Sequence, residues 1–294
     1  MVCVKEEVEW EVFSEHPEIR VFLEEKVARY AERLESTWRK ENLVLRVVCE
    51  GGCFVYKRIS GSDKVDEIER VKILRAEYPS LTPKLHICEG NAYLMDYVEG
   101  KNFFGLEASE RVERIARCGQ IFRDSWVTNG CVRKDISDKV KNLFLKYRKK
   151  SARFFSDDEL WLTDFSAFGE VPDKPSHNDM NAANVLYDEA IKLIDPSDEG
   201  YNDIARDVGR YCASTFFNNY DYFGNNRIHS LDIAHAFLGN FDSETLERAR
   251  FYMGESFLAF LNFPTISTPK EVLKKLAINV LTRKDVMAAL EESI

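Results

Sequence analysis

The chain of 294 residues carries 41 basic and 50 acidic side chains, a formal charge of -9, and 45% of its residues are hydrophobic. This apolar content excludes an intrinsically disordered chain, and the acidic balance argues against nucleic-acid binding and is compatible with a cationic substrate. No apolar run is long enough to span a membrane and the acidic start "MVCVKEEVEWEVFSE" is unlike a signal peptide, so we expect a soluble, cytoplasmic protein.

The first third of the chain alternates helical and strand patterns. Residues 17–29 have helical spacing, and Leu43–Ile59 contains two β-rich segments around a Glu-Gly-Gly turn, which predicts a hairpin. Lys64–Pro79 returns to helical spacing and ends at proline. Two more strand-like runs follow, "KLHIC" and "NAYLMDYVEG". The pattern predicts a small sheet with one crossing helix.

From Lys101 onward helical spacing dominates, as in the apolar face that runs from Val112 to Trp126 and in the amphipathic, basic segment Asp138–Arg153. The turn at Glu99-Gly100 is the expected boundary. We therefore predict an α+β fold with two packed lobes, a small sheet lobe over residues 1–98 and a mainly helical lobe over residues 99–294.

Polar residues gather between Pro175 and Tyr211, around two short strand-like runs, "NVLYD" and "IKLID". A hairpin of these runs starts one arm at Asn184 and ends the other at Asp195, and Asp179 precedes it on a loop. Carboxylate and amide oxygens suit magnesium better than zinc, and one carboxylate is left as a base. This combination suggests phosphoryl transfer.

The stretch "HNDMNAAN" resembles the catalytic loop H-x-D-x-x-x-x-N of kinase-like folds, and "LIDPSDEGYNDIARDVGRY" resembles the metal-binding segment and following helix of the aminoglycoside phosphotransferase and choline kinase family. Three further stretches resemble that family in the same order along the chain. They are "FVYK" for the strand with the ATP-phosphate lysine, "DEIERVKILRAEYPSLTPKL" for the helix and its loop, and "AYLMDYVEG" for the hinge. The resemblance implies a bilobal protein-kinase-like fold.

In the catalytic lobe the resemblance implies that Asp179 is the catalytic base and that Asn184 and Asp195 hold magnesium. His177 would brace the catalytic loop. Asp203 would cap the next helix and tie it to that loop.

In the nucleotide-binding lobe the resemblance implies that Lys57 binds the α and β phosphates of ATP or GTP. Glu69 is the expected partner of Lys57, and Glu67 lies close enough to compete. The backbone of three hinge residues would meet the adenine: Asp96, Tyr97 and Val98.

The chain departs from the family in the stretch before the second strand, where family members place phosphate-covering glycines. Here Arg33–Val47 contains no glycine. Ser36 and Thr37 are candidate substitutes, or the helix runs on to Lys40 and the strand and loop are rebuilt.

The acceptor is expected to be a small-molecule alcohol. Aromatic residues crowd Ser214–Asn226, and beside Asp198 and Glu199 they would suit an ammonium group, which favours a cationic alcohol. The same rings, Tyr220 among them, also fit an ordinary helical core.

Two functions are compatible with these residues. The first is a magnesium-dependent small-molecule kinase, and the second is a pseudokinase that binds nucleotide or a partner. A protein kinase fits less well, because no long activation segment follows the metal-binding stretch.

Overall fold

The computed structural model describes residues 6–34, 42–60, 64–126, 130–155, 165–197, 202–222, 227–263, 269–283 and 285–293. The chain divides into two units. The first comprises Met1–Gly100 and Lys192–Asp198, and the second comprises Lys101–Ile191 and Glu199–Ile294. The functional assignment of residues 1–98 and 99–294 as nucleotide and catalytic lobes stays a prediction.

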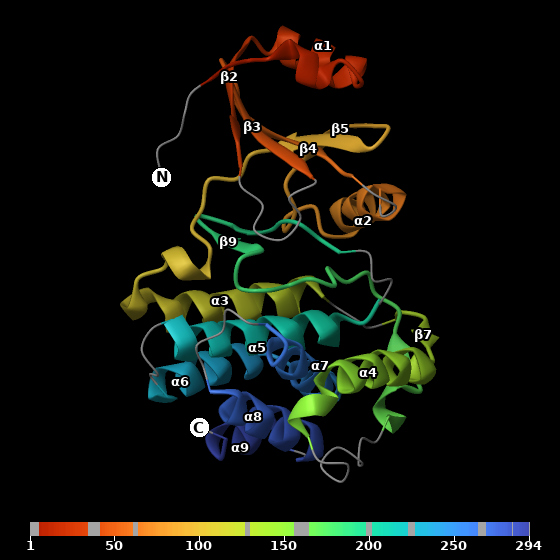
Figure 1. Ribbon diagram of the computed structural model, residues 1–294, viewed down its shortest axis with the longest axis vertical. Helices are drawn as coiled ribbons and strands as arrows, with labels where there is room; N and C mark the ends of the chain where they lie inside the picture. Colours follow the sequence, from red (N-terminus) through yellow and green to blue (C-terminus); the bar gives the residue numbers. More distant parts are fainter. Residues whose placement is uncertain are drawn as a thin grey trace. The chain divides into compact units, whose positions relative to one another are not determined.

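The first unit is built on a six-stranded antiparallel sheet in the order β1-β2-β3-β4-β6-β5 (Figure 1). In chain order the strands are β1 (Glu6–Glu7), β2 (Ala28–Arg33), β3 (Leu43–Cys49), β4 (Gly52–Arg58), β5 (Leu85–Glu89) and β6 (Ala92–Asp96). Its helices are α1 (Pro17–Glu25) and α2 (Lys64–Glu77), and a 3-10 turn, η1 (Trp10–Phe13), precedes α1. Both hairpins and the crossing helix are confirmed.

Strand alternation assigns the two faces of this sheet to different helices. Phe54 and Tyr56 of β4 pack in one cluster with Leu23 of α1. Tyr93 of β6 packs in another with Ile68 of α2. Successive side chains of a strand point to opposite faces. The residue after Tyr56 on β4, Lys57, therefore lies on the α2 face, opposite Tyr93 in the register.

The helical pattern at the start of the chain ends earlier than the sequence predicts. Helix α1 stops at Glu25, and the next residues form β2, which pairs with β3. A single residue in the left-handed region, Val27 at φ 52°, turns the chain between them. The alternative in which the helix runs on to Lys40 is wrong, while Ser36 and Thr37 lie outside the described residues.

The second unit is mainly helical. Its helices are α3 (Ala108–Ser125), α4 (Ser137–Ser151), α5 (Ile204–Tyr222), α6 (Arg227–Leu238), α7 (Ser243–Phe260), α8 (Lys270–Thr282) and α9 (Val286–Glu291). Its 3-10 turns are η2 (Phe103–Gly105), η3 (Ala152–Phe154) and η4 (Ser166–Phe168). Strand β7 (Arg133–Lys134) pairs with β8 (Val171–Pro172) in this unit. A further hairpin, β9 (Val185–Tyr187) paired with β10 (Ile191–Leu193), lies where the chain passes from this unit to the first.

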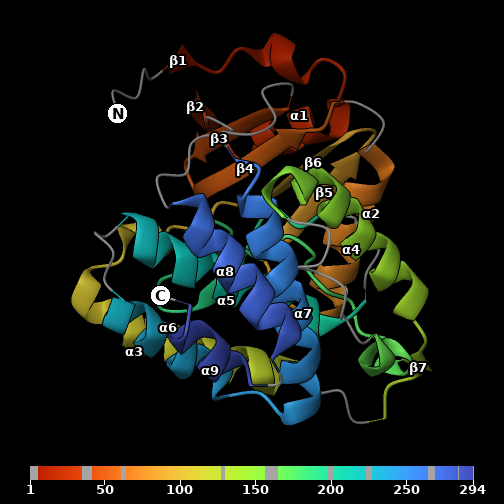
Figure 2. The ribbon, with the colours of Figure 1, turned by 60° about the horizontal axis from the view of Figure 1, so that its bottom comes forward.

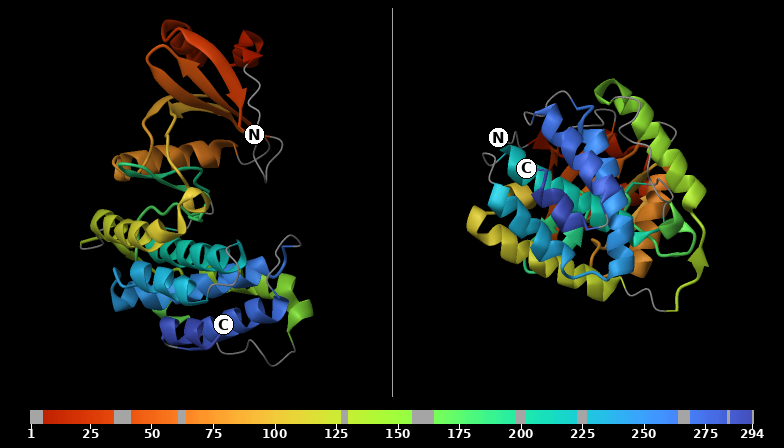
Figure 3. Two further views of the ribbon diagram at one scale, coloured as in Figure 1. Left: turned by 90° about the vertical axis from the view of Figure 1, so that its left-hand side faces the viewer. Right: turned by 90° about the horizontal axis from the view of Figure 1, so that it is seen from below.

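Helix α5 lies at the centre of the helical unit. It packs against both α6 and α7, and α7 in turn packs on α8 (Figure 2). Helix α3 runs beside α6, as the view from below shows (Figure 3). Among the described residues no helix has both the length and the apolar character needed to cross a membrane.

The close approach of α5 and α7 depends on Gly209. A Cβ at this position would meet the backbone oxygen of Ala249 and would lie 2.9 Å from the Cβ of Tyr252. Backbone atoms within a helix pair give way only if the helices move apart. The absence of a side chain at Gly209 therefore allows the two helices to touch.

We expect Gly209→Ala to lower the free energy of unfolding by about 1–3 kcal/mol, the usual cost of overpacking a core. Chemical denaturation measures this loss. Gly51→Ala is the matched control, because a Cβ at Gly51 would meet nothing within 4 Å. Equal stability of the two variants would show that α5 and α7 separate without cost.

Candidate active site

A first candidate cluster, within the first unit, centres on Lys57, which is 7% exposed. Its Nζ lies 2.6 Å from Oε1 of Glu67 on α2 and also donates to Oδ1 of Asp195. The hydroxyl of Tyr93 donates to the same oxygen of Glu67 at 3.2 Å. Strand β4, helix α2 and the segment after β10 thus bring one ammonium and two carboxylates together within the first unit.

Burial and the neighbouring groups act in opposite directions on the pKa of Lys57. Burial lowers its pKa, but its interactions with Tyr93, Asp195 and Glu67 outweigh burial and raise the pKa above the usual value. Burial also raises the pKa of Tyr93, so its hydroxyl keeps the proton that it donates to Glu67. Lys57 is therefore held as a buried cation, suited to binding phosphate oxygens.

The partner of Lys57 is Glu67 and not Glu69, which corrects the expectation from the sequence. Glu69 faces solvent and pairs with Lys72 on the same helix at 2.7 Å. The cause is the rotational phase of α2, whose inner face carries Glu67, Ile68 and Leu74. The apolar Ile73 of the same helix lies on the outer side and is 43% exposed.

Asp195 follows β10 in the left-handed backbone region, at φ 58°. Aspartate tolerates this region better than most residues. The strand before it is held by a hydrogen bond from the backbone N–H of Leu193 to the carbonyl of Leu81, 2.7 Å. The turn leaves the Asp195 side chain 56% exposed although it pairs with Lys57.

Of the predicted hinge residues, two already use their backbone N–H groups. The N–H of Asp96 donates to Lys84 and that of Tyr97 to Cys53, each at 2.9 Å. The N–H of Val98 donates to no atom of the described residues. Val98 is thus the candidate donor to a nucleotide base, and the roles of all three residues stay predictions.

A second candidate cluster, within the second unit, is the loop from His177 to Asn184, which is anchored on α5. Asp207 accepts the backbone N–H of His177 at 2.5 Å and that of Asn178 at 2.8 Å. Burial raises the pKa of Asp207 to about 7, and these N–H donors limit the rise by favouring the carboxylate. Further along, the hydroxyl of Ser214 accepts the N–H of Ala182 at 3.0 Å.

Asp179 and Asn184 lie in contact within this loop. The amide nitrogen of Asn184 donates to the backbone oxygen of Asp179 at 2.9 Å and to its Oδ2 at 3.2 Å. The Oδ1 of Asp179 is 2.9 Å from a guanidinium nitrogen of Arg210 on α5. The amide oxygen of Asn184 is then the atom that this residue would offer to a metal.

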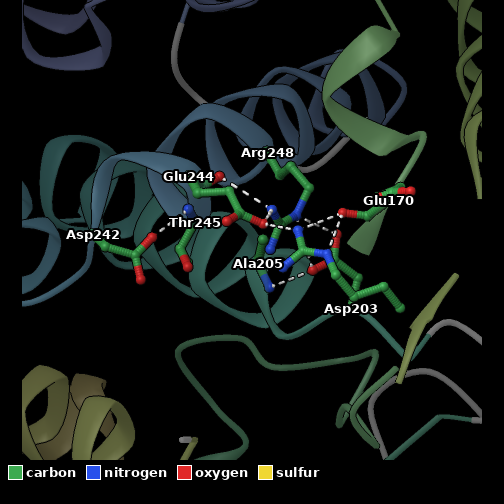
Figure 4. Close-up of polar contacts among 8 residues, drawn as sticks. Glu170, Asp203, Ala205, Asp242, Glu244, Thr245 and Arg248 are labelled. Carbon is green, nitrogen blue, oxygen red and sulfur yellow. Dashed lines mark hydrogen bonds and ion pairs between the residues drawn. The ribbon is translucent and has the colours of Figure 1, made fainter. Parts of the chain in front are cut away.

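The residues that position the loop differ in part from the expectation. Asp203 caps α5 by accepting the N–H of Ala205 at 3.1 Å, as predicted. Its carboxylate also pairs with Arg248 of α7, 3.2 Å away, in a network drawn in Figure 4. The tie between α5 and the loop is made by Asp207, one turn later. His177 is buried inside the loop.

A divalent metal is compatible with the donor chemistry. Among the residues that the structure describes, no group of three or more His, Cys, Asp or Glu side chains is placed to hold a metal. Magnesium does not require such a group, because it keeps several waters and takes one or two protein oxygens together with substrate phosphates. Asp195 and Asn184 each carry a hard oxygen ligand of this kind.

The residues proposed for a cationic acceptor are only partly described. Asp198 and Glu199 and the side chain of Tyr220 lie outside the described part of the chain. Phe216 is 0% and Phe217 is 4% exposed, and the ring of Phe217 stacks on Phe260 with centroids 4.9 Å apart. These two aromatic residues belong to the helical core.

No family model matches the sequence, and no curated protein matches it. Solved structures match the fold. A putative fructosamine-3-kinase from Thermobifida fusca YX-ER1 is 11% identical, with a TM-score of 0.57, covering 92% of this chain and 96% of its own. Aminoglycoside phosphotransferase APH(4)-Ia is 11% identical, with a TM-score of 0.54, covering 94% and 97%.

A choline/ethanolamine kinase family protein from Mesorhizobium loti is 16% identical, with a TM-score of 0.52, covering 89% of this chain and 92% of its own. The chain has the kinase-like α+β fold of these proteins. The predicted fold class is confirmed, and the match spans nearly the whole of each chain, so neither unit is an addition to a smaller fold.

We expect Glu67→Gln to lower the free energy of unfolding by about 1–3 kcal/mol, because it leaves a buried ammonium and the Tyr93 hydroxyl with a weaker partner. Glu69→Gln is the same substitution on the solvent side of α2, and its free energy of unfolding should stay within about 0.5 kcal/mol of the wild type. Denaturant titration compares the two. A larger loss for Glu69→Gln would restore the original assignment.

Proposed function

We propose that the protein is a magnesium-dependent small-molecule kinase, which transfers the γ-phosphate of ATP or GTP to a hydroxyl group. The observation that carries this proposal is the buried Lys57 held between Glu67 and Asp195. Buried ion pairs seldom stabilise a fold more than apolar residues of the same size, so charges held in this way are candidates for chemistry.

The catalytic loop supports the same function. Asp179 is 35% exposed, within reach of a substrate, while the backbone of its loop is fixed by Asp207 and Ser214. A carboxylate on a rigid loop fits the role of orienting a hydroxyl and accepting its proton. The kinase and phosphotransferase fold supports the proposal further.

In the proposed reaction Asp179 orients the acceptor hydroxyl and takes its proton as the oxygen bonds to the γ-phosphorus. The bond from that phosphorus to the bridging oxygen of the nucleoside diphosphate breaks. Lys57, held by Glu67, binds the α and β phosphates, and the N–H of Val98 binds the base. Magnesium, for which Asp195 and Asn184 are the proposed ligands, supplies charge neutralisation at the phosphates.

A cationic alcohol is the acceptor class that we propose to test first. The names of two structural neighbours, an aminoglycoside phosphotransferase and a choline/ethanolamine kinase family protein, refer to amine-bearing alcohols. The acidic balance of the chain is compatible with such a substrate.

We expect Asp179→Asn to retain nucleotide binding and to lose about 10²- to 10⁴-fold in turnover, the range for removal of a positioned base. Release of ADP or GDP in a screen of candidate alcohols measures turnover. Asp188→Asn is the matched control, because Asp188 is an exposed aspartate on the turn between β9 and β10. Equal turnover by Asp179→Asn and the wild type would reject the kinase assignment.

The two proposed magnesium ligands give a prediction that does not depend on the identity of the acceptor. Asp195 would offer a full negative charge and Asn184 a neutral oxygen, so Asp195→Ala should raise the magnesium concentration needed for nucleotide binding more than Asn184→Ala does. Titration of nucleotide binding at several magnesium concentrations measures this order. Nucleotide binding that ignores magnesium in the wild type would instead favour the pseudokinase.

A further inference from the structure

Helix α5 presents a stripe of polar side chains to the catalytic loop. Asp207, Arg210 and Ser214 are spaced i, i+3 and i+7, which places them on one face of the helix. Their partners follow in the same order along the loop, from His177 and Asn178 through Asp179 to Ala182. The helix and the loop therefore run alongside each other in register.

Arg210 differs from the other two members of the stripe. Asp207 and Ser214 are buried and bind backbone N–H groups, whereas Arg210 binds a side chain. From Asp203 to Phe217, Arg210 is the one residue that is not buried. The contact is thus placed where solvent and substrate reach it.

The carboxylate of Asp179 is held at both oxygens. Arg210 lies 2.9 Å from Oδ1, and Asn184 donates to Oδ2 at 3.2 Å. The shorter, charge-assisted contact is the stronger of the two. Of these two contacts, the one with Arg210 restrains rotation of the carboxylate more strongly, and the backbone anchors do not act on the side chain.

We infer that Arg210 is a positioning residue, which orients the Asp179 carboxylate toward the acceptor hydroxyl. This role rests on the proposed kinase function and assigns a residue that the sequence motifs do not include. The side chains of the pair are 21% and 35% exposed, and an ion pair of that exposure contributes little to stability. Removal of Arg210 should therefore leave the fold intact and reduce the chemical step.

The test uses hydrolysis of ATP with magnesium in the absence of alcohol, where water takes the place of the acceptor. Arg210→Met keeps the apolar stem and removes the charge, and we expect a loss of about 10- to 100-fold in kcat with an unchanged KM for ATP. Arg210→Lys keeps the charge without the planar fork and should lose less. Arg123→Met is the control, because Arg123 is an exposed arginine paired with Asp124 at 2.8 Å.

A double variant shows whether Arg210 acts through Asp179. If it does, Arg210→Met should have no further effect on kcat in an Asp179→Asn background. Losses that multiply would mean that Arg210 contacts the nucleotide or acceptor itself, and would overturn the inference. If Arg210→Met does not fold, the Lys variant carries the same comparison.

These measurements distinguish a failure of the positioning role of Arg210 from a failure of the proposed kinase function. A wild type that hydrolyses ATP together with an equally active Arg210→Met variant overturns the positioning role alone. A wild type that neither hydrolyses nucleotide nor phosphorylates any alcohol overturns the kinase function and the role of Arg210 with it.

Discussion

The loop from His177 to Asn184 depends on one constraint, which is that α5 crosses an apolar core while carrying charged side chains. Arg206 and Asp207 are both 0% exposed, so each must find a partner inside the protein. Asp207 finds the backbone of His177 and Asn178, and Arg206 reaches the side-chain oxygen of Asn178 at 3.3 Å. The loop thus supplies hydrogen-bond partners for the buried charges of the helix, and the helix in turn fixes the conformation of the loop.

This mutual requirement explains how an irregular segment can be rigid. Asn178 sits in the left-handed region at φ 63°, a conformation that a free loop would readily leave. Its backbone N–H and its side chain are both engaged by α5, which holds the residue there. Asp179 follows directly, and its position is therefore set by the helical core behind it.

The sequence was sufficient for the fold class, because strand alternation and helical spacing are local properties and the motif resemblance pointed to the kinase-like arrangement. It was not sufficient for the choice between Glu67 and Glu69. That choice depends on the rotation of α2 against the sheet. The sequence leaves this rotation ambiguous, because apolar residues lie on more than one side of the helix, with Ile68 buried and Ile73 exposed. Strand β2 was missed because Ala28–Arg33 lacks an apolar alternation and is specified by pairing with β3.

The stripe of Asp207, Arg210 and Ser214 was also missed, although it left a signal in the sequence. Polar residues at i, i+3 and i+7 share one face of a helix that is largely buried, and such a pattern predicts a partner for that face. The partner itself is not local. Asp207 lies 30 residues beyond His177 in the sequence, and only the folded chain shows that the two are in contact.

Two ion pairs of the region around α5 both join an aspartate to an arginine but differ in burial. Asp203 and Arg248 have side chains that are 0% and 1% exposed, so removing either leaves a buried charge and the pair is committed to the junction of α5 and α7. Asp179 and Arg210 have the same chemistry but are half-buried, so loss of one partner leaves the other in contact with water and costs little stability. This half-buried pair joins α5 to the loop from His177 to Asn184, so under the proposed function Arg210 can keep Asp179 oriented while the carboxylate stays open to a substrate.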